Sequence, residues 1–110
     1  MRANIPKGPS MNSMLRQAQK MQEDMAALQE ELDAREYEVK AGGGMVAVKI
    51  NGQKEVLSID IQPEIVDPDD IETLSDILVA AVNEAIKRVE TTNAEEMGKL
   101  TKGINIPGLF

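Results

Sequence analysis

The chain has 110 residues, a length that limits it to a single domain. Its net charge of −7, taken as a whole, disfavours nucleic acid as a partner. Cysteine and histidine are absent, so disulfides, thiol chemistry and the commonest general base and metal ligand are excluded. Without a run of 18 apolar residues or a hydrophobic signal core, the chain is predicted to be cytoplasmic, with no membrane partner.

The first structured stretch is a heptad repeat. Residues 1–9 contain two prolines and a glycine and are predicted to form a flexible arm, after which Ser10 is placed to cap a helix reaching about Arg35. Apolar residues then recur at alternating spacings of 3 and 4, which is typical of a helix that buries a narrow seam against another helix. The predicted packing positions of this seam include Met14, Met21, Met25 and Leu28.

The next stretch changes to the period of a strand. Three alternating segments, 36–41, 46–50 and 57–61, are separated by Gly42-Gly43-Gly44 and by Asn51-Gly52, the latter a strong hairpin signal. We therefore expect a three-stranded antiparallel β-meander with one apolar face. The predicted packing residues of its second and third strands are Val46, Val48, Ile50, Leu57 and Ile59.

A second long helix follows the meander. Asp67 is the predicted N-cap and Pro68 the first helical residue, and an apolar stripe that includes Leu78 and Val82 runs from Ile71 to Val89. The stripe is wide enough to touch both the first helix and the sheet. We expect this helix to reach about Met97 and to stop at Gly98, so that residues 10–98 form one domain and residues 99–110 an irregular tail.

Together these elements predict an α+β fold: long helix, three-stranded antiparallel meander, long helix. The only aromatic residues are Tyr37 and Phe110, so the core must be aliphatic. A chain of this size and order has little interior of its own, which favours a homo-oligomer, most simply a homodimer.

The charge is unevenly distributed. Residues 1–22 carry +4, residues 23–84 carry −12, and residues 85–110 carry +1. If the two helices pack antiparallel, the two basic segments converge on one tip, far from the acidic sheet, and such a tip can meet DNA phosphates. The candidate DNA contacts are Arg2, Lys7, Arg16, Lys20, Lys87, Arg88, Lys99 and Lys102.

Other motifs favour structural roles. The glycine triplet lies between strands rather than before a helix, so it indicates a turn and not a phosphate cradle. The acids Asp67, Asp69 and Asp70 lack the glycine and closing glutamate of a calcium loop and are better explained as helix capping. No acid–base pair is evident, so neither an enzyme, a cofactor nor a small-molecule substrate is predicted.

The chain resembles the YbaB/EbfC family of bacterial nucleoid-associated proteins. The resemblance rests on residues 15–22, 41–46, 51–52, 61–63 and 78–85, and on the tail from Gly103 to Leu109. It implies a tweezer-like homodimer joined through the sheet region, which binds double-stranded DNA through projecting helices, without a cofactor, in the cytoplasm at the nucleoid. Only Arg16 and Lys20 lie inside a matching stretch. Lys87 and Arg88 lie beside a matching stretch, and the predicted role of Arg2 and Lys7 in DNA binding rests on their charge alone.

A second hypothesis remains open. Two long helices flanking a hairpin also resemble prefoldin subunits, which hold unfolded clients at their helix tips. In that case the methionine-rich seam and the apolar tail would form a client surface, and the chain would be a coiled-coil interaction module or holdase.

Overall fold

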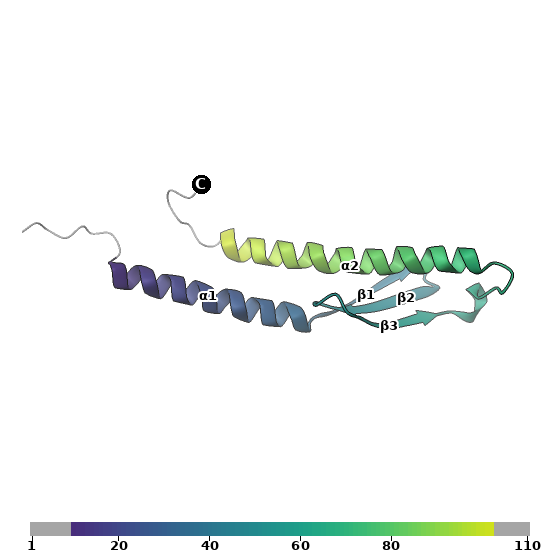
Figure 1. The fold of residues 1–110 in the computed structure, drawn as a ribbon, viewed down its shortest axis with the longest axis horizontal. Helices are drawn as coiled ribbons and strands as arrows, with labels where there is room; N and C mark the ends of the chain where they lie inside the picture. The colour runs from purple at the N-terminus through teal and green to yellow at the C-terminus, as the bar shows by residue number, and fades with distance from the viewer. Residues whose placement is uncertain (1–9, 103–110) are drawn as a thin grey trace, which may run out of the picture.

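The computed structural model describes residues 10–102. The elements follow in the order α1 (Met11–Ala34), β1 (Glu36–Ala41), β2 (Val46–Asn51), β3 (Val56–Ile61), a short 3-10 helix η1 (Pro63–Ile65) and α2 (Ile71–Lys102). Figure 1 shows the sheet lying against one half of α2 while α1 runs beside the other half. The predicted α+β fold of helix, meander and helix is confirmed.

Helix α1 begins at the predicted cap. Ser10 has an extended backbone, and its hydroxyl oxygen accepts a hydrogen bond from the Ser13 N–H at 3.1 Å, which satisfies one of the free N–H groups of the first turn. The helix ends at Ala34, because Arg35 returns to the extended backbone that leads into β1. Leu32, in its last turn, is the buried residue of α1.

The sheet is antiparallel in the order β1-β2-β3, and Val48 is paired with Val39 on one side and Ile59 on the other. The glycine triplet forms the first turn, with a positive φ at each of its three residues, a conformation that glycine adopts without strain. The second turn is longer than the predicted two-residue hairpin. It continues through Lys54, which has a φ of 66°, and Asn51 Oδ1 accepts hydrogen bonds from the N–H groups of Gln53 and Glu55.

Helix α2 differs from its predicted bounds at both ends. Asp70 is the cap, since its Oδ1 accepts from the Thr73 N–H at 3.3 Å, whereas Asp67 closes the preceding turn by accepting from the Asp69 N–H at 2.9 Å. The predicted stop at Gly98 is wrong, because α2 continues to Lys102. A glycine inside a helix costs only about 1 kcal/mol, which the good helix-forming residues around it offset. Residues 99–102, predicted as the start of an irregular tail, are therefore helical. Residues 1–9, predicted as a flexible arm, and residues 103–110, the rest of the predicted tail, lie outside the described residues.

The core lies between the sheet and α2. Val39, Val46, Val48 and Ile50 of the sheet are buried against three small or β-branched residues of α2, spaced one turn apart: Ala81, Ala85 and Val89. Leu78 and Val82 are half-buried at the margin of this core. The prediction that the α2 stripe packs on the sheet is therefore confirmed.

The seam of α1 is covered over only part of its length. Leu32 is fully buried and Met21, Met25 and Leu28 are half-buried, but Met14 is 55% exposed. Figure 1 shows that the described end of α2 lies level with the middle of α1, so α2 cannot cover the first half of the seam. Within residues 10–102, the predicted packing of the seam against a second helix is therefore found for its second half only.

Candidate nucleic-acid interface

The first half of α1, residues 11–22, extends beyond the described end of α2 and is here called the projecting half (Figure 1). Its direction is set at the other end of the helix, where the second hairpin turn holds the last turn of α1. The Gly52 N–H donates to the Arg35 carbonyl oxygen at 2.9 Å, and a Cβ built on Gly52 would lie 1.7 Å from the Leu32 carbonyl oxygen. Only glycine permits this approach, which aims α1 away from the sheet.

Arg16 and Lys20 are the cations of the projecting half. They are exposed and one helical turn apart, and residues 10–22 contain no acidic side chain. Neither forms an ion pair with any residue in the described range. At 100° per residue they lie on the side of α1 away from Met14, so they face solvent rather than the seam. Two such cations are free to meet phosphate oxygens.

Lys87 and Arg88 lie elsewhere, and the predicted convergence of the basic segments on one tip is wrong for them. Arg88 Nη1 donates to the Glu38 carbonyl oxygen of β1 at 3.0 Å, which places this pair over the sheet. They line a shallow depression on the flank of α2 together with Glu84, Thr91 and Thr92. The order of segments along the chain predicted that these charges belong to α2, but not that the sheet covers this part of α2.

The remaining predicted cations are only partly described. Lys99 is 73% exposed, and its Nζ lies 3.8 Å from Glu96 Oε2. Lys102 is the last residue of α2, and its side chain lies outside the described residues, as do Arg2 and Lys7. The structure therefore brings Arg16 and Lys20 together, puts Lys99 nearer the base of the projecting half, and separates Lys87 and Arg88 from both.

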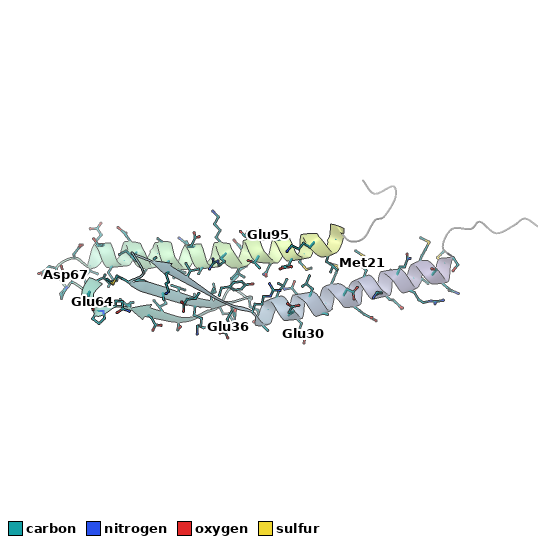
Figure 2. The ribbon with its side chains drawn as sticks, turned by 180° about the vertical axis from the view of Figure 1, so that it is seen from behind. Met21, Glu30, Glu36, Glu64, Asp67 and Glu95 are labelled. Atoms are coloured by element: carbon teal, nitrogen blue, oxygen red, sulfur yellow. The ribbon has the colours of Figure 1, made fainter. Side chains whose placement is uncertain are left out.

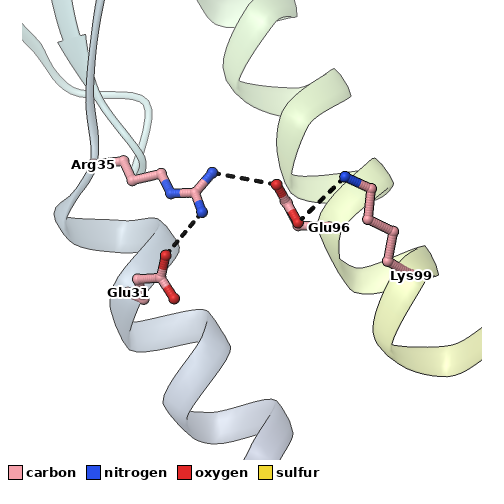
Figure 3. A network of polar contacts seen from close by, with 4 residues as sticks. All are labelled: Glu31, Arg35, Glu96 and Lys99. Carbon is pink, nitrogen blue, oxygen red and sulfur yellow. Dashed lines mark hydrogen bonds and ion pairs between the residues drawn. The ribbon is translucent and has the colours of Figure 1, made fainter. Parts of the chain in front are cut away.

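A polar network at the base of α1 was not among the predicted site residues (Figure 3). Arg35 Nη2 lies 2.8 Å from Glu31 Oε1, and Arg35 Nη1 lies 3.4 Å from Glu96 Oε1 on α2. The hydrogen bond to Glu31 raises the pKa of the Arg35 guanidinium above its ordinary value, so the group remains charged. The spacing of four residues between Glu31 and Arg35 is visible in the sequence, but the contact with Glu96, 61 residues away, is not.

Strand β3 has no cover in the described chain. Helix α2 packs on β1 and β2, and every residue of β3 is exposed. Four of them are large and apolar, with exposed fractions of 37–47%; this set, called the β3 strip, consists of Val56, Leu57, Ile59 and Ile61. Leu57 and Ile59 were predicted as packing residues, but within residues 10–102 no element covers their side chains.

Residues 10–102 give little support to metal binding, membrane crossing or base stacking. Residues 10–102 contain no group of three His, Cys, Asp or Glu side chains able to hold a metal ion. Neither α1 nor α2 is long and apolar enough to cross a membrane. The projecting half carries no aromatic side chain on which a base might stack. What α1 offers is a pair of exposed cations on one face and an apolar stripe on another.

The structure defines a class of small proteins in which a three-stranded sheet and a long helix support a second helix that projects as an arm. The sequence model of the YbaB/EbfC DNA-binding family matches residues 7–104. The chain belongs to the YbaB/EbfC DNA-binding family.

Individual relatives agree with this assignment. The chain is 55% identical over 102 residues to a nucleoid-associated protein of Alkaliphilus metalliredigens, covering 93% of this chain and 90% of the relative. It is 50% identical over 109 residues to a nucleoid-associated protein of Thermoanaerobacter pseudethanolicus, covering 99% and 98%. The fold is similar to the crystal structure of an uncharacterized protein from Helicobacter pylori, with a TM-score of 0.70 and 23% identity over 86% of this chain and 99% of that one.

Proposed function

We propose that this protein is a nucleoid-associated protein of the bacterial cytoplasm that binds double-stranded DNA as a homodimer, through phosphates and with little sequence preference. The observation that carries the proposal is the pair Arg16 and Lys20, exposed and unpaired by any described residue on the projecting half of α1. Family membership supports duplex DNA as the ligand. No cofactor and no small-molecule substrate is needed for this function.

Charge segregation supports contact at the arm rather than the body. Most of the acidic residues belong to the second half of α1, the sheet, the segment between the sheet and α2, and the first half of α2. Glu64 and Asp67 mark the end of the molecule opposite the projecting half (Figure 2). Repulsion between that end and DNA is largely screened, because the Debye length is about 8 Å at physiological salt. The arm therefore meets phosphates while the acidic end stays away.

The β3 strip supports the homodimer. A free strand edge with a row of exposed apolar side chains is a template for association, and in natural proteins such an edge is normally covered. The opposite edge strand, β1, is partly occupied, since Arg88 binds the Glu38 carbonyl oxygen. We infer that two copies join through β3, which leaves both projecting halves free in a tweezer-like arrangement.

Fluorescence anisotropy with a duplex of mixed sequence, repeated over a salt series, tests the proposal. Each phosphate contact contributes about 0.9 to the slope of log K against log salt. The double variant Arg16→Glu/Lys20→Glu removes four cations per dimer, so we expect a slope reduced by up to about 4 and an affinity at least about tenfold lower. The matched control is Lys40→Glu/Lys49→Glu, which changes the same charge at two exposed positions of the sheet. Equal losses in both variants would show that net charge alone governs binding and would overturn the assignment to α1.

A holdase is the second candidate function, favoured by the exposed apolar residues of the projecting half, Met11, Met14 and Leu15. It predicts that the protein suppresses aggregation of an unfolded client and that Met14→Ser abolishes this effect. Suppression of aggregation in a protein with no affinity for DNA would favour the holdase over DNA binding.

A further inference from the structure

The apolar stripe of the projecting half lacks a partner in the described chain. Met11 is 72% exposed and Met14 is 55% exposed, and with Ala18 and Met21 they form one face of α1, here called the methionine face. Met21 lies between α1 and the end of α2, where the cover from α2 stops (Figure 2). An exposed row of large apolar side chains is typical of a surface that another segment or molecule covers.

The chain itself supplies a segment of suitable chemistry at this place. Helix α2 ends at Lys102, and the next eight residues are Gly-Ile-Asn-Ile-Pro-Gly-Leu-Phe. Four of the eight are large and apolar, none is charged, and Pro107 does not allow the segment to continue as a regular α-helix. The described end of α2, after which this segment follows in the sequence, lies level with the middle of α1, where the uncovered part of the seam begins (Figure 1).

The segment is long enough to cover the face. Eight residues in extended conformation span about 26–29 Å. The helix from Met25 back to Met11 rises about 21 Å at 1.5 Å per residue. Attachment to α2 also keeps the segment at a local concentration in the millimolar range, which favours it over a separate molecule competing for the same face.

We propose that residues 103–110 pack along the methionine face of α1 in the same chain and so complete the seam that α2 leaves open. The occupant is this segment rather than a second copy or a client protein. Arg16 and Lys20 point away from the methionine face, so the packing leaves them free, and it stands whether or not the protein binds DNA.

Disulfide trapping in the full chain tests the proposal, because the sequence has no cysteine of its own. The test pair is Met14→Cys with Ile106→Cys. The matched control is Asn12→Cys with Ile106→Cys, since Asn12 is also exposed and lies one half-turn away on the opposite face. With oxidised glutathione as oxidant, we expect the test pair to form an intrachain disulfide at least tenfold faster than the control. Equal rates, or a faster disulfide between chains, would overturn the proposal.

A second measurement reports on the same contact without cysteines. Phe110 is the single phenylalanine of the chain, so its ring is a specific probe in spectra of protein labelled at the methionine methyl groups. We expect Phe110→Ala to shift the methyl resonances of Met11 and Met14, which lie at the far end of the proposed path, and to leave that of Met45, in the first turn of the sheet, unchanged. Unshifted Met11 and Met14 resonances would contradict the packing.

Discussion

Arg35 Nη1 lies 3.4 Å from Glu96 Oε1, and this ion pair ties the base of α1 to α2 (Figure 3). Beyond it α2 ends level with the middle of α1, so the projecting half has no second helix beside it, as Figure 1 shows. Arg16 is 19 residues from Arg35, about 28 Å along the helix, so a rotation of about 5° at the base moves Arg16 by about 2 Å. The contact therefore helps to set the angle of the arm.

We expect Glu96→Gln to broaden the distribution of distances between α1 and α2, because the variant removes the charge that holds Arg35 to α2. Spin labels on cysteines introduced at Gln17 and Glu95, two exposed positions, allow this distribution to be measured by pulsed electron resonance. The control is Glu31→Gln, which removes a contact within α1 only. A distribution that Glu96→Gln leaves unchanged would mean that the contacts of Leu32 and Gly52 hold the arm without the ion pair.

Gly52 should tolerate no side chain. The Cβ of an alanine would overlap the Leu32 carbonyl oxygen, so the turn and α1 must move apart, at a cost of about 1–3 kcal/mol in free energy of unfolding. Urea denaturation at fixed protein concentration measures this cost. The control is Gly98→Ala, where nothing lies within 4 Å of the added Cβ and helix propensity predicts a gain of up to about 1 kcal/mol. Equal effects of the two substitutions would contradict the close approach of Gly52.

Asp70, rather than Asp67, should cap α2. Replacement of Asp70 by alanine removes the acceptor for the Thr73 N–H, and we expect a loss of about 1 kcal/mol in the free energy of unfolding. Asp70→Asn retains a cap of similar strength and should restore most of the stability. Thermal denaturation followed by circular dichroism distinguishes the variants. A larger loss for Asp67→Ala than for Asp70→Ala would place the cap at Asp67.

Ile59→Asp should produce monomers if the β3 strip joins two copies. The side chain of Ile59 is 41% exposed in the single chain, so a charge there costs little in the monomer but is buried in the dimer. Sedimentation equilibrium measures the molecular mass directly. The control is Ser58→Asp, the neighbouring position on the other face of the same strand. A dimer that persists in Ile59→Asp would exclude the β3 strip as the interface.

Local patterns in the sequence were sufficient for the elements and their order. The spacing from Met11 to Leu32 predicted α1, the alternation around Val46 and Val48 predicted the meander, and Ser10 was correctly placed as a cap. These features depend on residues a few positions apart, and periodicity reports on such neighbours directly. The exceptions were local too: Asp67 and Asp70 are both acceptable caps, and Gly98 is a stop signal that the flanking helix overrides.

The candidate site depended on distances that no local pattern contains. Periodicity marks the methionines of α1 as one face but not which of them α2 reaches, and that is determined by the length of α2 and the place where its core residues Ala81, Ala85 and Val89 meet the sheet. The same placement removes Lys87 and Arg88 from the arm and brings Glu96 to Arg35. Sequence therefore determines which faces are apolar or charged, and tertiary packing determines which of them stay exposed, because coverage depends on contacts between residues far apart in the chain.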